Sequence, residues 1–360
     1  MGSEIFSIFW GSNTLAVSKP ILVIKFGTAS ITRENGELDE SIIAAIARQV
    51  STLHSQYNMV LVSSGAVAAG KKHLLQYNGT ISERKAAAAI GNPLLLNKYA
   101  QYFQPYGIAI AQSLCERRHF SDRGQFLQLK KTYEELWASN IIPVANENDV
   151  VSDLELKFSD NDELATLIAV GFGASGLLFS TSVGGVLDKE GQVVPQIDVI
   201  DESVFALADT KKSSLGLGGM VSKLTFARLA TRMGIRVVIF GIHTPDGIPN
   251  ALEGKTGTLC LPQQCSMPAR KKWLASGSLV TGRLQVDTGA QKALEKRHSL
   301  LAVGVKAVLE KFTRGEVVEI VNENNEAIAV ARAKVSSDAL SGNKKIQNVE
   351  IAHADDIVLL

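Results

Sequence analysis

Short runs of β-branched residues alternate with helical patterns along most of the chain, and this alternation limits the possible folds more than any other feature. The strand-like runs are ILVIKFG from Ile21, MVLVSS from Met59, IIPVANEND from Ile141, GLLFST from Gly176 and IRVVIFG from Ile235. Helical patterns separate them at Ser41–His54, Asp122–Ser139, Leu164–Val170 and Lys223–Met233. Strands that alternate with helices predict an α/β fold, with a mostly parallel open sheet sandwiched by helices. Ligands of such sheets bind at the carboxyl ends of the strands.

The last quarter of the chain has a different pattern. After an α/β domain over residues 21–262, a proline-bearing and then basic stretch, PQQCSMPARKKW, predicts a linker over 263–274. The later stretch EVVEIVNENNEAIAVARAKV predicts two alternating strands around an Asn/Glu-rich turn, preceded by an amphipathic helix at Ala290–Lys296. Residues 275–360 are therefore predicted to form a small β-rich barrel.

The first twenty residues argue against a secreted protein, and the overall charge argues against a protein drawn to nucleic acid or to a membrane surface. Residues 1–20 lack a basic leading region, and Gly, Ser and Asn interrupt their apolar run, so we interpret them as an N-terminal extension and not as a secretory signal. Thirty-seven Lys and Arg against thirty-six Asp and Glu give a net charge of +1. No overall field therefore draws the chain to nucleic acid or to an anionic membrane.

Cysteine usage and the longest charge-free stretch point to a protein of the cytoplasm. Cys115, Cys260 and Cys265 form neither a CxxC pair nor a Cys/His cluster, which argues against a disulfide framework and structural zinc. The charge-free stretch Leu164–Leu187 is as long as a membrane span, but it contains five glycines. We predict a buried helix that turns into a buried strand, and no membrane contact.

The stretch VLVSSGAVAAGKKHL at residues 61–75 contains most of a P-loop. In a P-loop, however, a Ser or Thr that binds Mg²⁺ follows the lysine, and here Lys72 occupies that position. The alanine-rich spacer also favours a helix. We predict instead a strand at Met59–Val62, a turn capped by Ser63 or Ser64, and a helix whose N-terminus faces an anion.

A second stretch, GFGASG at Gly171–Gly176, fits the GxGxxG pattern of dinucleotide-binding proteins letter by letter. That fingerprint follows a strand and opens a helix. Here the stretch follows a helical pattern and precedes a strand-like run. We therefore predict a tight turn from helix to strand and no cofactor at this position.

Four short stretches carry charged and amide groups to strand ends or helix starts. IKFGT, at Lys25–Thr28, places a lysine at a strand end beside a glycine turn, and GLGGMVSK, at Gly216–Lys223, ends a glycine-rich loop with another lysine. The two lysines could clamp a phosphate. NEND at Asn146–Asp149 and SDND at Ser159–Asp162 supply acids and amides. Capping of the following helix explains Asp160 alone. The others indicate a polar site at one edge of the sheet.

In their order and spacing, these stretches resemble the glutamate 5-kinases, a group within the amino-acid-kinase family that carries a C-terminal PUA domain. The resemblance rests on VIKFGTASIT, VSSGAVAAGKKHL, IPVANEND, SDNDELATLIA and GLGGMVSKLTFARLA, and it covers residues 21–353. The stretch YGIAIAQSLCERRHFSDRGQFLQLKKT is similar to a helical segment of that family. The resemblance implies an amino-acid-kinase domain over 21–262 and a PUA-like domain over 275–360. It also implies ATP-dependent phosphorylation of the side-chain carboxylate of L-glutamate to L-glutamyl 5-phosphate, the first step of proline synthesis.

The resemblance also implies roles for individual residues. Its catalytic residues correspond to Lys25, Lys223 and Asp162, with Asp162 orienting the two lysines. Its nucleotide-binding residues correspond to Lys25, Thr181, Ser182, Leu217, Gly218, Gly219, Met220, Val221, Ser222 and Lys223. Its glutamate-binding residues correspond to Ser64, Asp149 and Asn161. Mg²⁺ is expected to be bound through the ATP phosphates, with no protein metal site.

One departure from the family keeps alternatives open. The family usually has Thr-Asp where this chain has Thr181 and Ser182, which bears on ATP affinity and base preference. The alternatives are a catalytically impaired paralogue, a kinase for acetylglutamate, aspartate or a nucleotide, and an RNA-binding or regulatory protein that retains the kinase fold.

The expected partners beyond glutamate and ATP come from the resemblance as well. It implies a homo-oligomer and proline as a feedback inhibitor. PUA domains elsewhere bind RNA, and the basic cluster Arg270–Trp273 is the best support for that here. Residues 270–360 nevertheless hold fourteen Lys and Arg against eleven Asp and Glu, too even a balance for a strong phosphate footprint.

Overall fold

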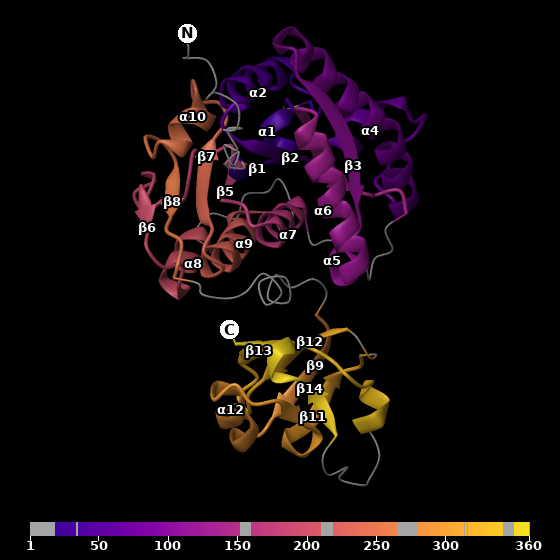
Figure 1. Ribbon diagram of the computed structural model, residues 1–360. Helices are drawn as coiled ribbons and strands as arrows, with labels where there is room; N and C mark the ends of the chain where they lie inside the picture. The colour runs from indigo at the N-terminus through magenta and orange to yellow at the C-terminus, as the bar shows by residue number, and fades with distance from the viewer. Residues whose placement is uncertain are drawn as a thin grey trace, which may run out of the picture.

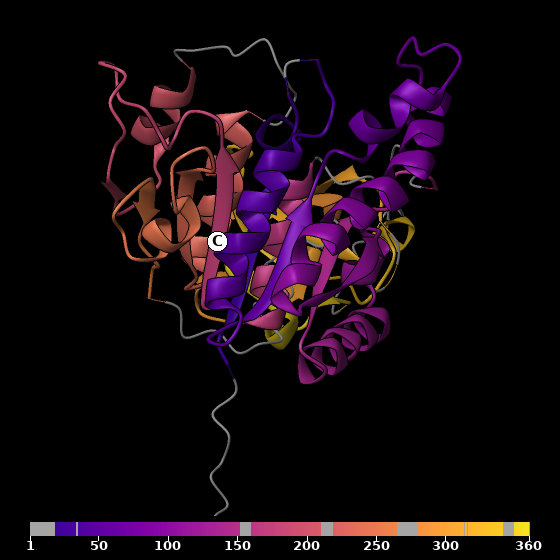
Figure 2. The same cartoon turned by 90° about the horizontal axis from the view of Figure 1, so that it is seen from above.

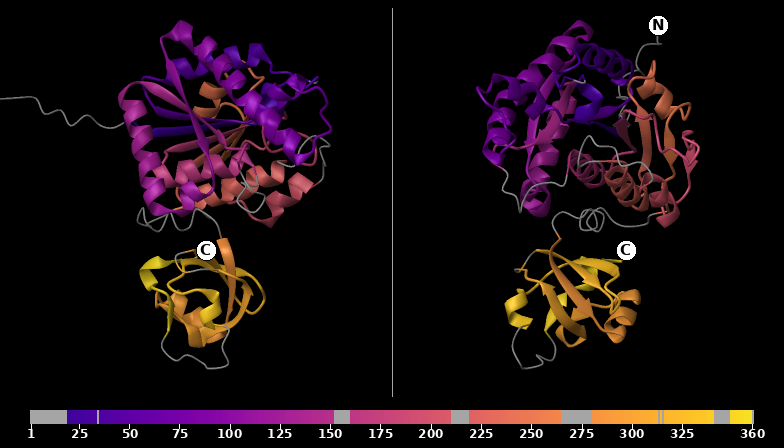
Figure 3. Two further views of the ribbon diagram at one scale, coloured as in Figure 1. Left: turned by 90° about the vertical axis from the view of Figure 1, so that its right-hand side faces the viewer. Right: turned by 180° about the vertical axis from the view of Figure 1, so that it is seen from behind.

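The computed structural model describes residues 19–33, 35–151, 160–209, 219–264, 280–312, 314, 316–340 and 349–359. Figures 1 and 3 show a large body built around one sheet and a smaller body built from the orange and yellow strands. Residues 1–18 and 265–279, which include most of the predicted extension and linker, lie outside the described residues. The predicted fold class, a mostly parallel sheet with helices and a smaller β-rich part, is confirmed.

The large sheet has the strand order β3-β4-β2-β1-β5-β7-β8-β6. Its strands are β1 (Ile21–Phe26), β2 (Asn58–Ser63), β3 (Ala109–Cys115), β4 (Ile141–Glu147), β5 (Gly176–Thr181), β6 (Gln196–Ile197), β7 (Arg236–Gly241) and β8 (Thr258–Cys260). From β3 to β7 all neighbours pair in parallel, and β8 runs antiparallel to β7. Strands β2, β3 and β4 all lie on one side of β1, whereas β5, β6, β7 and β8 lie on its other side. Ligands of open α/β sheets bind at such a reversal, outside the carboxyl ends of the strands.

Helices cover both faces of this sheet, and Figure 2 shows α2 and α4 lying across one of them. That face carries α2 (Glu40–Leu53), α4 (Ile81–Phe103) and α10 (Gly247–Leu252), and the other carries α6 (Arg123–Ala138), α7 (Asn161–Phe172) and α9 (Met220–Arg232). The shorter elements are α1 (Thr28–Ile31), α3 (Ala66–Gly70), η1 (Lys71–His73), η2 (Gln104–Tyr106), α5 (Arg118–Ser121) and α8 (Glu202–Asp209).

The side chains of strand β1 pack into the apolar clusters on both faces of the sheet. Leu22 and Ile24 are buried in the apolar cluster under α2 and α4, whereas Val23 is buried in the cluster under α6, α7 and α9. Successive side chains of a strand point to opposite faces, so a strand covered on both faces must be apolar throughout. Burying each such side chain stabilises the fold by about 1.5–3 kcal/mol. Lys25, also buried, breaks this apolar pattern.

The prediction for the charge-free stretch is confirmed, whereas the one for the stretch that begins YGIAIAQ is wrong in part. The charge-free stretch is the buried helix α7 followed by the buried strand β5, and Gly173, with φ of 76°, forms the turn between them. The stretch that begins YGIAIAQ was expected to be helical, but residues 109–115 form strand β3. Strand pairing explains the difference, because all seven residues pair in parallel with β4. Among the described residues, no helix combines the length and the apolar character that a membrane span needs.

The P-loop-like stretch has a different structure from a phosphate-binding loop. The N-cap of α3 is Gly65, with φ of 103°, so neither Ser63 nor Ser64 caps this helix as predicted. A Cβ atom at Gly70, the second glycine of the stretch, would lie 1.9 Å from the carbonyl oxygen of Ala87 in α4. Close packing of α3 against α4 therefore requires this glycine.

The smaller body contains a five-stranded sheet of order β11-β9-β12-β13-β15 and a two-stranded sheet of β10 and β14. The elements are β9 (Val280–Val286), α12 (Thr288–Glu295), β10 (Leu300–Leu301), η3 (Ala302–Gly304), β11 (Val305–Glu310), β12 (Val317–Val321), β13 (Ala327–Arg332), η4 (Ser337–Leu340), β14 (Glu350–Ala352), η5 (Ala354–Asp356) and β15 (Ile357–Leu359). Strands β12 and β13 pair in antiparallel fashion. They are the two strands predicted around the Asn/Glu-rich turn, and α12 is the predicted helix.

Candidate active site

Three charged side chains from distant parts of the chain meet at the carboxyl edge of the sheet. Lys25 lies near the end of β1, Asp162 in the first turn of α7 and Lys223 in the first turn of α9 (Figure 1). The Nζ of Lys25 is 2.5 Å from Oδ1 of Asp162, and the Nζ of Lys223 is 3.0 Å from Oδ2. The three residues are 4%, 0% and 8% exposed, in the order Lys25, Asp162, Lys223. One buried carboxylate thus joins two ammonium groups, and the structure brings together all three residues predicted as catalytic.

Asp160 connects the starts of α7 and α9. It is the N-cap of α7, and its Oδ1 accepts hydrogen bonds from the backbone N–H groups of Asp162, at 2.8 Å, and Glu163, at 3.2 Å. Its Oδ2 accepts a hydrogen bond of 2.5 Å from the hydroxyl of Ser222. The capping interpretation of Asp160 is confirmed, and the same side chain also fixes the two helix starts that carry Asp162 and Lys223.

The electrostatic balance of this cluster favours an added anion. Burial is the main cause that lowers the pKa of Lys25 below its usual value. Asp162 opposes this effect, the positive charge of Lys223 adds to it, and Asp160 opposes it to a smaller extent. Two buried ammonium groups share the Asp162 carboxylate, so the three residues carry one more positive than negative charge. An anion that reached both lysines would reduce their mutual repulsion.

The predicted nucleotide residues are described in part. Leu217 and Gly218 lie outside the described residues. Gly219 is the N-cap of α9 and Met220, Val221 and Ser222 form its first turn; no described side chain caps this helix. Thr181 is buried at the end of β5, and Ser182 follows it in an exposed position. Because β5 pairs with β1, these two residues lie on the same sheet edge as Lys25.

Two of the three residues predicted to bind glutamate are in direct contact. The Nδ2 of Asn161 donates to Oγ of Ser64 and to Oδ1 of Asn146, at 2.8 Å each. The backbone N–H of Glu147 donates to Oδ1 of Asn161 at 3.3 Å. Asp149, the third predicted residue, is half-buried in the loop after β4 at this edge of the sheet. An amide and a hydroxyl thus meet at the start of α7, and Asp149 lies on the same sheet edge.

Sequence reasoning missed two polar groups beside these residues. Asn92, in the middle of α4, is buried, and its Oδ1 accepts a hydrogen bond of 2.9 Å from Nδ2 of Asn146. Arg117, just before α5, forms an ion pair with Glu163 in the first turn of α7. An asparagine on the otherwise apolar buried face of a helix is the signal that could have identified Asn92, but residues 81–103 were not recognised as a helix.

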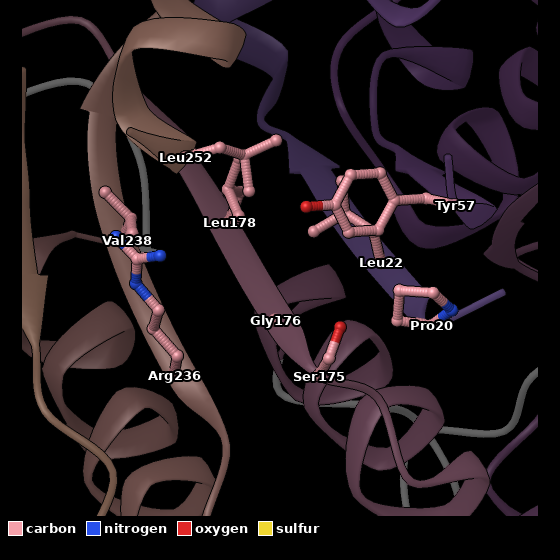
Figure 4. Close-up of a pocket in the computed structure, with 9 residues that line it drawn as sticks. All are labelled: Pro20, Leu22, Tyr57, Ser175, Gly176, Leu178, Arg236, Val238 and Leu252. Atoms are coloured by element: carbon pink, nitrogen blue, oxygen red, sulfur yellow. The ribbon is translucent and has the colours of Figure 1, made fainter. Parts of the chain in front are cut away.

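A hollow of about 270 Å³ lies at the other edge of the sheet, near the amino ends of β1, β5 and β7 (Figure 4). Its walls are mostly apolar, formed by Pro20, Leu22, Tyr57, Ser175, Gly176, Leu178, Arg236, Val238 and Leu252. Arg236 is the only charged residue among them. This hollow lacks the paired charges of the carboxyl edge, so it is not the candidate active site.

Comparisons with known proteins show the family and the fold of the chain. The model of the amino acid kinase family matches residues 20–241, and that of the PUA domain matches residues 282–354. Curated relatives include the glutamate 5-kinase of Klebsiella pneumoniae strain 342, 38% identical over 89% of this chain and 90% of that protein. The glutamate 5-kinase of Vibrio vulnificus is 35% identical over 96% of this chain and 98% of that protein. Among solved structures, the carbamate kinase of Giardia aligns with a TM-score of 0.50 and 18% identity over 68% of this chain and 99% of that one, which shows the fold.

Proposed function

Since the chain belongs to the amino acid kinase family and is similar over most of its length to glutamate 5-kinases, we propose that Lys25, Asp162 and Lys223 form its phosphoryl-transfer centre. The reaction is the ATP-dependent phosphorylation of the side-chain carboxylate of L-glutamate. The observation that carries the proposal is the double ion pair, in which one buried carboxylate holds two buried ammonium groups at the carboxyl edge of the sheet.

The chemistry explains why two lysines are needed. A carboxylate must approach the γ-phosphate, and two like charges about 4 Å apart repel by roughly 4 kcal/mol at an effective dielectric constant of 20. Cations on either side of the transferring group offset this repulsion and stabilise the charge that develops on its oxygens and on the leaving ADP. Lys25 comes from the end of strand β1 and Lys223 from the start of helix α9, and the two reach the same carboxylate from two directions. We assign the same two directions to their contacts with the phosphates.

The reaction requires no general base. A glutamate side chain has an ordinary pKa of about 4.3, so the attacking oxygen is already ionised at neutral pH. Asp162 is therefore assigned to holding the lysines and not to removing a proton, since each of its oxygens faces an ammonium group. Its carboxylate is thereby occupied, and no group of three His, Cys, Asp or Glu side chains in the described part of the chain could hold a metal. Lys25, Asp162 and Lys223 therefore fit a Mg²⁺ ion that is bound through the ATP phosphates, where the ion would neutralise part of the phosphate charge.

The proposed activity can be tested against its alternatives in one assay. Purified protein is incubated with ATP, Mg²⁺ and either L-glutamate, N-acetylglutamate, L-aspartate or no acceptor, and the acyl phosphate is trapped as its hydroxamate while ADP is measured. We expect ADP and hydroxamate in equal amounts with L-glutamate only. Turnover with N-acetylglutamate or aspartate alone would assign another substrate, and the absence of turnover with every acceptor would support the impaired or regulatory alternatives.

Asp149 is proposed to bind the ammonium group of glutamate, because this acidic residue follows β4 at the sheet edge that also carries Ser64 and Asn161. Asp149→Ala should raise the KM for glutamate by about tenfold or more, because a hydrogen bond between charged groups contributes about 1.5–3 kcal/mol. The KM for ATP and kcat should change little. Asp338→Ala is the matched control, since Asp338 is 81% exposed at the side chain and pairs only loosely with Lys311 in the smaller body. If Asp149→Ala changed only the KM for ATP, the assignment would be wrong.

The remaining expectations follow from the family. We propose a kinase domain over residues 21–262 and a PUA-like domain over 275–360, which is supported by the matched ranges 20–241 and 282–354. Thr181 and residues 217–223 are proposed to bind ATP, and Ser182 is proposed to weaken or alter base recognition relative to relatives with aspartate there. A cytoplasmic location, a homo-oligomer and inhibition by proline are proposed on the same ground.

A further inference from the structure

A chain of hydrogen-bonded amides connects the interior of α4 to the start of α7, and one backbone N–H identifies the direction of every bond in it. The N–H of Glu147 can only donate, so the atom of Asn161 that it meets is Oδ1. The other end of that amide, Nδ2, must therefore face Ser64 and Asn146. Asn146 presents Oδ1 to Asn161, so its Nδ2 faces Asn92, which presents Oδ1 in turn.

This direction has a consequence for the Ser64 hydroxyl. Its oxygen accepts the hydrogen bond from Asn161, so its own proton is left to be donated elsewhere. Ser64 is half-buried at the sheet edge, and none of the described residues accepts that proton. A carboxylate is a strong acceptor for such a hydroxyl. The opposite direction of the amides would have turned the Ser64 proton toward Asn161 and left only lone pairs to face a bound anion.

Asn92 has a feature that folding alone does not explain. The residue is only 5% exposed, and its Nδ2 donor has no hydrogen-bond partner among the described residues. A buried donor without a partner lowers stability, so a purely structural position in α4 would favour an apolar side chain. The Asn92 side chain nevertheless uses its Oδ1 to hold Asn146. This combination indicates selection for the orientation of Asn146 and not for the stability of the helix.

We propose that Asn92 is a positioning residue that fixes the amides of Asn146 and Asn161 in the orientation in which Ser64 donates its proton to a carboxylate of the amino-acid substrate. This proposal rests on the proposed function, because it assumes that the substrate reaches Ser64. It adds a residue from a fourth segment of the chain, which makes no direct contact with the substrate and controls its binding through two amides. Without the Asn92 acceptor, the Asn146 amide can turn over, and the Asn161 amide then keeps only the 3.3 Å hydrogen bond from the backbone N–H of Glu147 to hold it toward Ser64.

The test is steady-state kinetics of Asn92→Leu, Ser64→Ala and the double variant, with Asn92→Ala as a second substitution in case leucine does not fit. We expect Asn92→Leu to raise the KM for L-glutamate roughly tenfold, the effect of one lost hydrogen bond to a charged group, with the KM for ATP and kcat nearly unchanged. If Asn92 acts through Ser64, the double variant should have nearly the same KM for glutamate as Ser64→Ala alone. Additive effects on KM would overturn the proposal.

Stability measurements separate positioning from packing. Asn92→Leu removes one unpartnered buried donor but also leaves the buried Nδ2 of Asn146 without its acceptor, so the Tm should change little. Leu95→Ala, three residues along the same helix, should lower the Tm clearly and leave the KM for glutamate unchanged. A wild-type KM for glutamate in Asn92→Leu and Asn92→Ala, with wild-type turnover intact, would overturn the role of Asn92 and leave the proposed function standing. No turnover of glutamate by the wild type would instead remove the proposed function itself.

Discussion

Lys223→Ala is expected to lower kcat by about 10²- to 10³-fold, the range seen when one preorganised donor to a transition state is removed. Lys25→Ala should have an effect of the same size. Each lysine is held by one oxygen of the same carboxylate, so neither can move to replace the other. Because the ammonium groups interact most strongly with charge that develops during transfer, the KM for glutamate should change little in either variant. The measurement is initial-rate kinetics of ADP and hydroxamate formation.

The control for this experiment is Lys255→Ala. Lys255 is 66% exposed at the side chain, pairs with Glu253 and follows α10 near the opposite edge of the sheet. Loss of an exposed ion pair of this kind changes stability by at most about 1 kcal/mol, so kcat should stay at the wild-type value. If Lys223→Ala or Lys25→Ala folded normally and also kept the wild-type kcat, the two-lysine mechanism would be excluded.

The charged centre shows which part of the site could be predicted from the sequence. Lysines and acids at the ends of apolar runs can be found from the sequence alone, because buried parallel strands and helix starts have clear sequence patterns. Parallel strands place these ends on a common edge, so proximity of Lys25 and Asp162 follows once the fold class is known. The family resemblance then supplied the pairing itself. The distances, and the sharing of both oxygens of Asp162, required the structure.

Helix α4 shows why the rest could not be predicted. Its centre reads Gly91-Asn92-Pro93, a combination that usually marks a turn. Proline inside a helix removes one backbone hydrogen bond, and glycine lowers helix propensity. The helix tolerates both because tertiary packing outweighs propensity: a Cβ atom at Gly91 would lie 1.7 Å from the carbonyl oxygen of Ala66 in α3. Asn92 was therefore hidden in a segment that resembled a loop.

The P-loop-like stretch also shows that a local sequence pattern does not reveal tertiary contacts. Gly70 matches a phosphate-binding motif by letter, yet its role follows from the contact between α3 and α4, which no local pattern records. The missing hydroxyl after the lysine and the alanine-rich spacer were the local signals against the motif. A short motif therefore predicts chemistry only where the surrounding elements are also known.

Asp162→Asn should have the second large effect, because it removes the carboxylate that two buried ammonium groups share. Breaking a buried ion pair by removing one partner costs about 3–5 kcal/mol, and here one carboxylate serves both Lys25 and Lys223. We expect a lower Tm and a kcat reduced by at least about 10²-fold, since the lysines lose the group that orients them. ATP supplies negative charge at the same place, so it should raise the Tm of the variant more than that of the wild type.

The pH dependence of this variant tests the electrostatic role of Asp162 separately from its structural role. Burial lowers the pKa of Lys25, and the negative charge of Asp162 raises it again. Asparagine removes only the opposing effect, so the pKa of Lys25 must fall further and its proton must be lost at a lower pH. The residual activity of Asp162→Asn should therefore decline at lower alkaline pH than that of the wild type.

Glu163→Gln is the control: Glu163 pairs with Arg117, so this variant should keep the wild-type alkaline limb of the pH–activity profile. An unshifted limb in Asp162→Asn would mean that Asp162 does not maintain the charge of Lys25.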